Sequence, residues 1–131
     1  MAKQLHPDVL DKGISEIKTS ATKIMLINGY SIGDSLAAIT ANRLAEAAVA
    51  TGDFTLGNVA GDNGTDRRIV FAAGKTGNAT VTVAAGQPLH FAFVDGTRVL
   101  WVTKETSEMA VTAGNPIEFP SLTHVQKQPA A

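Results

Sequence analysis

The stretch of sequence that decides the fold is residues 89–101, which read LHFAFVDGTRVLW. Its first half alternates, so three large apolar side chains share one face of an extended strand: Leu89, Phe91 and Phe93. Asp95 and Gly96 form a strong two-residue hairpin signal, because both residue types tolerate the positive φ angles of such turns. The stretch therefore predicts a β-hairpin in which Val99 and Trp101 face the aromatic side chains of the first strand.

Similar short runs recur on both sides of this hairpin, about every ten residues, and glycine-rich turns separate them. We expect strands at 22–27, 69–71, 80–83, 109–111 and 117–119, and a turn at 74–78. Residues 57–66 are the most turn-prone part of the chain and predict a surface loop. Six or so short strands predict a mainly β fold, an antiparallel β-sandwich or jelly-roll-like module.

Two segments have helical patterns. The first lies near 8–19, where Pro7 suits a first helical turn and three apolar residues fall on one face: Leu10, Ile14 and Ile17. The second lies near 34–50, an alanine-rich segment that Asp34 or Ser35 can cap. We expect one domain over 1–131, with an N-terminal arm at 1–6, a core at 7–120 and a C-terminal tail at 121–131 with little structure of its own.

The composition narrows the classes of function. A chain of 131 residues with 44% hydrophobic residues suits a single packed core. With 11 basic and 12 acidic residues it lacks the basic surface that nucleic-acid binding requires. It contains no cysteine, so it has no disulfide and no thiolate ligand. No apolar run is long enough for a signal peptide or a membrane span, so we expect a protein made in the cytoplasm without a membrane partner.

The motifs with chemical meaning are weak. Gly74-Lys75-Thr76 resembles the end of a phosphate-binding loop, but the earlier glycine is missing and a strand-like segment follows. Residues 62–66 supply oxygen atoms but lack the spacing of a calcium loop. The three histidines are scattered, without metal-ligand spacing. We therefore predict no catalytic residue, no cofactor and no metal, and a protein that is not an enzyme.

Several segments in order resemble a known group of proteins. They are Ile17-Lys18, ATKIML at 21–26, Tyr30, GDF at 52–54, Arg67-Arg68, HFAFVDG at 90–96, LWVT at 100–103, VTAGNPI at 111–117 and FP at 119–120. In this layout the chain resembles small virion proteins of tailed bacteriophages that are encoded near the major capsid protein. The match covers most of the chain, although each segment is a strand-and-turn pattern.

The resemblance implies a structural protein of the virion, and first of all a capsid decoration (cement) protein. Such a protein would bind the outside of the phage head, contact the major capsid protein, and associate with itself as a homo-oligomer. A head–tail joining, tail or fibre-associated subunit is the alternative. A carbohydrate-binding β-sandwich is a further alternative, but Trp101 and Tyr30 lie far apart in sequence, whereas such modules group their aromatic residues.

Four residues are candidates for the interface with a partner. Leu5 lies in the N-terminal arm, Leu122 and Val125 lie in the C-terminal tail, and His90 lies on the opposite face of its strand from Phe91. Segments with few core residues often become ordered on a partner. We therefore expect that deletion of 1–6 or 121–131 leaves the domain folded but weakens particle binding, with the loop 57–66 as a third contact.

Overall fold

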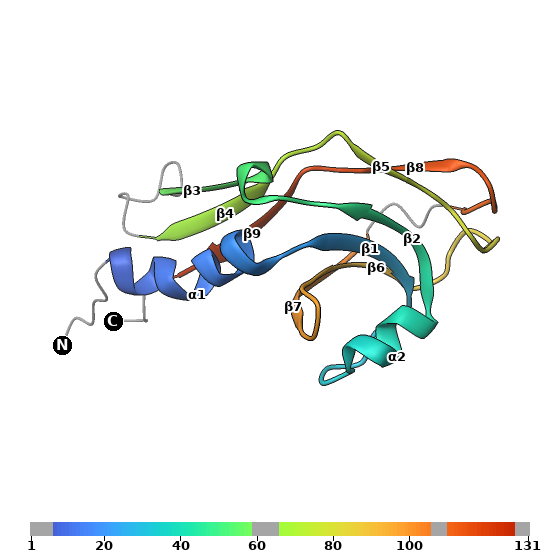
Figure 1. Cartoon of the computed structure of the whole chain (residues 1–131), viewed down its shortest axis with the longest axis horizontal. Helices are drawn as coiled ribbons and strands as arrows, with labels where there is room; N and C mark the ends of the chain where they lie inside the picture. The colour runs from blue at the N-terminus through green and yellow to red at the C-terminus, as the bar shows by residue number, and fades with distance from the viewer. Residues whose placement is uncertain (1–6, 59–65, 106–109, 128–131) are drawn as a thin grey trace.

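The protein is mainly β, with antiparallel sheets and two helices, one of them N-terminal, as predicted. A computed structural model describes residues 7–58, 66–105 and 110–127. The elements in chain order (Figure 1) are α1 (Pro7–Ser20), β1 (Lys23–Asn28), α2 (Leu36–Ala41), β2 (Arg43–Ala48), the 3₁₀ turn η1 (Thr51–Asp53), β3 (Phe54–Asn58), β4 (Arg67–Phe71), β5 (Lys75–Asn78), β6 (Leu89–Val94), β7 (Val99–Lys104), β8 (Pro116–Phe119) and β9 (Leu122–Gln126).

Three antiparallel sheets enclose the main core. A four-stranded sheet has the order β2-β1-β6-β7, a three-stranded sheet has the order β3-β4-β9, and β5 pairs with β8. One face of the four-stranded sheet packs against the other two sheets and against α1. Phe54, Phe71 and Phe93 meet there with ring centroids 5.0 to 5.5 Å apart. This packing of sheets on sheets gives the predicted sandwich-like architecture.

The other face of the four-stranded sheet has a smaller apolar cluster. It consists of Met25, Ile27, Ile39, Ala92 and Val94, and Ile39 belongs to α2. The central strand β1 is therefore buried on both faces. This explains why residues 24–27 are continuously apolar instead of alternating.

Helix α1 lies as the sequence predicts. Its residues Leu10, Ile14 and Ile17 are buried, and it packs mainly against β3 and β4. Asp11 accepts two hydrogen bonds from the guanidinium of Arg67, at 2.8 and 3.0 Å. This bidentate pair fixes the helix to β4.

The predicted hairpin at 89–101 forms, but the detail of its second strand was wrong. Phe93 pairs with Trp101 and Val94 pairs with Val99, so Leu100 is an extra residue in β7, a β-bulge. The bulge reverses the alternation, and Val99 therefore packs on the smaller cluster instead of facing the aromatic core. The connection runs over residues 95–98, and the amide of Asp95 donates to the carbonyl of Arg98 at 3.1 Å, so the turn is centred on Gly96 and Thr97 instead of Asp95 and Gly96.

The predicted helix at 34–50 was wrong beyond Ala41. Ser35 does cap α2, because its Oγ accepts a hydrogen bond from the Ala38 amide at 3.2 Å. Residues 43–48 instead form β2 and pair with β1. Tertiary pairing outweighs the helical preference of alanine here. A bulge at Leu44 also lets Leu44 and Ala45 both enter the core.

The predicted tail at 121–131 was wrong over 122–126, which form β9. This strand pairs with β4 along its whole length, and Leu122 lies opposite Phe71. The turn predicted at 74–78 was wrong over 75–78, which form β5 and pair with β8, whereas Gly74 has a positive φ and lies outside the strand. The strand predicted at 80–83 reduces to a single bridge between Val83 and Val111.

The loop predicted at 57–66 is corrected at its start and lies mostly outside the described residues. Gly57 and Asn58 belong to β3 and pair with Arg68 and Arg67 of β4. Residues 59–65 lie outside the described part of the chain, as do the arm at 1–6 and Met109 of the strand predicted at 109–111.

Candidate functional site: a groove between α1, β7 and β9

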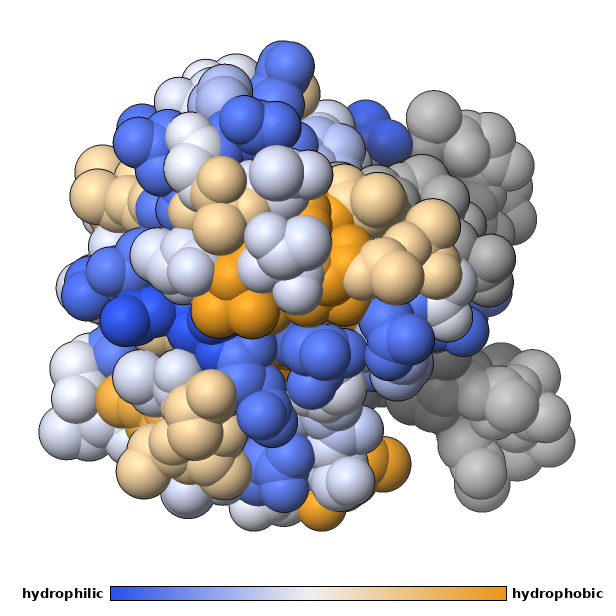
Figure 2. Space-filling model, turned by 90° about the vertical axis from the view of Figure 1, so that its right-hand side faces the viewer, coloured by the Kyte–Doolittle hydropathy of each residue, from blue (hydrophilic) through white to orange (hydrophobic). Residues whose placement is uncertain are grey.

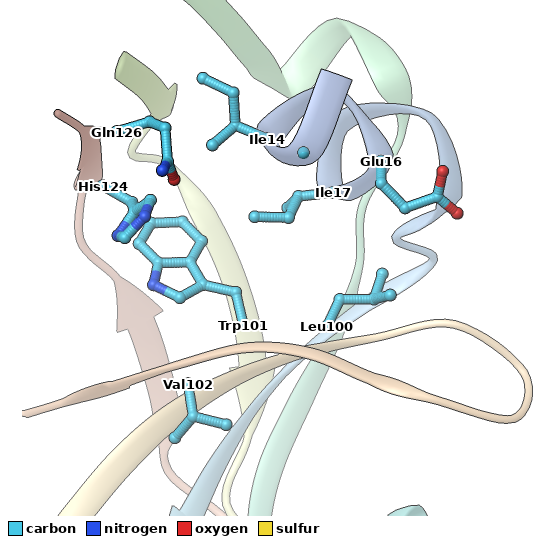
Figure 3. Close-up of a pocket in the computed structure, with 9 residues that line it drawn as sticks. Ile14, Glu16, Ile17, Leu100, Trp101, Val102, His124 and Gln126 are labelled. Atoms are coloured by element: carbon cyan, nitrogen blue, oxygen red, sulfur yellow. The ribbon is translucent and has the colours of Figure 1, made fainter. Parts of the chain in front are cut away.

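A groove of about 440 Å³ opens where α1 meets strands β7 and β9. Figure 3 shows the two isoleucines of α1 above Leu100 and Trp101 of β7, with the β9 side chains at one side. The residues that line it are Gly13, Ile14, Glu16, Ile17, Leu100, Trp101, Val102, His124 and Gln126. The groove therefore combines an apolar floor with a few polar groups at its rim.

Trp101 is the largest side chain in the groove. Its indole stacks on the ring of Phe93 in the core, with centroids 4.8 Å apart and an angle of 11° between the planes. The ring of His124, which belongs to β9 of the three-stranded sheet, lies 6.0 Å from the ring of Trp101. Because Leu100 is the bulge residue, it packs on the same side of the sheet as Trp101. The bulge thus places two adjacent apolar side chains in one groove.

The groove lies between two open sheet edges, because β7 and β9 are the last strands of their sheets. The amide of Glu105 donates to the carbonyl of Leu89 at 2.9 Å. Hydrogen-bonded pairs alternate in antiparallel sheets, so the backbone groups of Val102 and Lys104 point away from β6. Within the described part of the chain, no further strand pairs with this edge.

The same alternation applies to β9. The amide of Ala72 donates to the carbonyl of Asp53 at 2.9 Å, and this bond fixes which residues of β4 direct their backbone groups to β3. The other residues of β4 bond to β9, so the backbone groups of Thr123 and Val125 point away from β4. Val125, a predicted interface residue, is half-buried on this edge. Two rows of backbone hydrogen-bonding groups therefore border the groove, and such edges are templates for pairing with another chain.

A charged cluster holds the β6–β7 turn against α1 at one end of the groove. Arg98 contacts Glu16 at 2.9 Å and Asp95 at 2.7 Å. Hydrogen bonds from the backbone amides of Thr97 and Arg98 lower the pKa of Asp95 to about 2. The hydrogen bond from Arg98 lowers the pKa of Glu16, and Glu16 in turn raises the pKa of Arg98. Arg98 and Glu16 are exposed, so their ion pair orients the turn and adds little stability.

The structure does not bring together the three predicted interface residues that it describes, His90, Leu122 and Val125. Leu122 is half-buried and packs on the main core from β9, whereas His90 points to the opposite face of the four-stranded sheet. There the His90 ring lies 6.1 Å from that of Tyr30 and 3.1 Å from the carbonyl oxygen of Pro88. Leu5 lies outside the described residues.

Sequence reasoning missed Trp101 and His124 as a pair in one site. They are 23 positions apart in sequence, since 124 minus 101 is 23. They meet only because β9 pairs with β4 instead of forming a tail. The lone tryptophan on a strand is the signal that the sequence offers, and the hairpin pattern predicts only its contact with the first strand, which the stacking on Phe93 confirms.

The weak chemical motifs remain without a site among the described residues. Lys75 of the phosphate-loop-like motif lies in the extended strand β5, where it contacts Asp53 at 3.2 Å. Residues 62–64 of the calcium-like segment lie outside the described ranges. No group of three metal-ligating side chains occurs in residues 7–58, 66–105 and 110–127. In those same ranges no helix is long and apolar enough to cross a membrane.

A second exposed apolar feature lies in the turn before α2. Ile32 is 99% exposed, although hydrogen bonds fix the turn that presents it. The amide of Ser31 donates to a carboxylate oxygen of Asp34 at 3.0 Å, and the amide of Asp34 donates to the carbonyl of Ser31 at 3.0 Å.

Apolar surface also gathers near the centre of the end face shown in Figure 2, with polar residues around it.

Comparisons with known proteins give no assignment for this site. No family model, no curated protein and no solved structure matches the chain. The interpretation of the groove therefore depends on its own geometry.

Proposed function

We propose that the chain is a non-enzymatic structural subunit of a tailed-bacteriophage virion, a capsid decoration (cement) protein. In this role it binds the outside of the phage head and stabilises contacts between major capsid subunits. The observation that supports a subunit role is the apolar groove bordered by the open edges of β7 and β9. Added strands from another chain are recognised by main-chain hydrogen bonds, and adjacent pockets take their side chains.

The architecture suits this role in physical terms. A head filled with DNA must resist outward pressure, and many copies of a small rigid module add contact area between subunits. The interlocked core of Phe54, Phe71 and Phe93 supplies rigidity. The role requires the major capsid protein and further copies of the chain as partners, and it requires no cofactor, nucleic acid or membrane.

We place the contact with the shell at the turn that presents Ile32. An apolar side chain on a turn fixed by hydrogen bonds loses little conformational entropy when a partner covers it. Tyr30 and His90 lie beside this turn, because the amide of Gly29 donates to the carbonyl of Pro88 at 2.9 Å. His90 therefore stays a candidate contact, whereas the half-buried Leu122 contributes to the core.

Co-sedimentation with shells of the major capsid protein from the same genome tests this proposal. We expect saturable binding, and at least about tenfold weaker binding for Ile32→Ser, which corresponds to about 1.4 kcal/mol. Val9→Ser is the matched control, because Val9 is also exposed, at 55%, but lies on α1. Absence of binding to shells would contradict the proposal, and binding to isolated necks, tails or fibres would assign the chain to those parts instead.

A further inference from the structure

We propose that a second copy of the chain pairs with β7 through its own β7, in an antiparallel register centred on a two-fold axis at Val102. The pairing joins two four-stranded sheets into one. It also brings Trp101 and Thr103 of the second copy beside the groove between α1, β7 and β9. The inference does not require the role in a virion.

The first argument is that residues 99–103 of β7 lack the charged and proline residues that protect sheet edges. Charged residues, proline and short length normally prevent edge strands from pairing with other chains. Residues 99–103 of β7 read VLWVT, without charge or proline. By contrast, β8 contains Pro116 and Glu118, and the edge of β2 is covered by β5. An uncharged edge of this kind is available to pair with a strand of another chain.

The second argument is that β7 is complementary to itself in this register. The outward backbone groups of Val102 meet those of Val102 in the second copy, and Leu100 lies opposite Lys104. Trp101 lies opposite Thr103, and pairs of an aromatic and a β-branched side chain are favourable across strands. No two like charges face each other in this arrangement.

Charge complementarity supports the antiparallel direction. At the start of β7, the carboxylate of Asp95 and the guanidinium of Arg98 in the turn meet the carboxylate of Glu16 from α1, which gives this cluster a net charge of −1. The exposed Lys104 is at the other end of the strand, and the adjacent Glu105 is only 7% exposed. Antiparallel pairing places Lys104 of each copy near the acidic turn of the other copy.

Symmetry favours β7 pairing with β7 over β7 pairing with β9. A two-fold contact uses the same surface twice and closes at two copies, whereas pairing of β7 with β9 of another copy leaves one free edge at each end and continues into a filament. The bulge at Leu100 limits the regular part of the edge to 101–104, and the register about Val102 pairs residues 101–103 of the two copies within this part.

Two charge variants at the axis test the inference by analytical ultracentrifugation. Wild type should sediment as a dimer that dissociates on dilution. Val102→Lys and Val102→Glu each place two like charges at the axis, so each should weaken dimerisation at least about tenfold. An equimolar mixture of the two variants should restore the dimer, because Lys then faces Glu. The Val81→Lys variant, changed at an exposed valine outside the sheets, should dimerise as wild type does.

The mixing experiment separates loss of pairing from loss of folding, because a misfolded variant would not recover when mixed. A wild-type protein that is monomeric at all concentrations would overturn the inference. Dimerisation of each charge variant alone would also overturn it. Hydrogen exchange of the Val102 and Lys104 amides gives a further check. If these amides exchange slowly only when the protein is bound to particles, the edge pairs with a shell subunit and the inference is wrong. Particle binding by Ile32 is measured separately, so failure of the dimer leaves the proposed function intact.

Discussion

Gly77 of β5 lies directly against the backbone of Glu46 in β2, so that a Cβ atom at position 77 would overlap the carbonyl oxygen of Glu46. Next to this contact, the amide of Thr80 donates to the carbonyl of Leu44 at 2.8 Å. Strand β5 therefore crosses close over the edge of the four-stranded sheet. The glycine allows this approach, because any larger residue would separate the two strands.

Gly77→Ala should destabilise the fold by about 1–3 kcal/mol, because the overlap is with backbone atoms that cannot rotate away. The free energy of unfolding in denaturant measures the loss. Gly57→Ala is the matched control, since Gly57 also lies in a strand and a Cβ atom there meets nothing within 4 Å. Equal stabilities for the two variants would show that β5 does not approach β2 this closely.

Phe91→Ala should cost about 3–5 kcal/mol, because it empties a fully packed position in the core. Phe91 is 2% exposed and meets Phe119 edge to face, with centroids 5.9 Å apart. Thermal and denaturant unfolding measure the change, with Val81→Ala at an exposed site as the control. An unchanged melting temperature for Phe91→Ala would disprove the register of β6.

The hairpin and the inward face of Phe91 were predictable, because alternation and a turn signal lie within one short stretch. The bulges at Leu100 and Leu44 were not, since an extra residue in a strand has no mark in the sequence pattern. Helical periodicity and alanine content likewise predicted a helix where pairing with β1 produces β2. Local pattern thus identified the class of fold, and long-range pairing determined the elements.

Truncation distinguishes the predicted tail from the strand that the structure contains. A chain ending at Lys127 keeps β9 and should unfold at nearly the wild-type denaturant concentration. A chain ending at Pro120 loses the partner of β4 and exposes Phe71, so it should be strongly destabilised or unfolded. If the shorter chain kept wild-type stability, the pairing of β9 with β4 would be incorrect.

Asp95 should make the stability depend on pH in the acid range. Its folded pKa of about 2 is lower than its ordinary value of 3.8, so the stabilisation is complete above that ordinary value. It is lost as the pH falls through about 2. Asp95→Asn cannot ionise, so its stability should fall less steeply below about pH 4. Denaturant titrations across this pH range, repeated at high salt, measure the free energy of unfolding. If this free energy depended on pH equally in the wild type and in Asp95→Asn, the assignment to Asp95 would be contradicted.

The candidate site was less predictable than the fold. Trp101, His124 and Ile17 belong to three separate elements, and no sequence pattern joins them. Ile32 lies in a turn whose hydrogen bonds become visible only in the structure. An interface depends on which side chains remain uncovered after folding, and exposure of this kind is a property of the completed packing.

The resistance of phage heads to heat tests the proposed function most directly. Heads that lack the protein, and the same heads after the purified protein is added back, are heated while DNA release is measured. The account predicts that bound protein raises the temperature of DNA release and that the effect saturates when its sites are full. An equal release temperature with and without bound protein would contradict a decoration role.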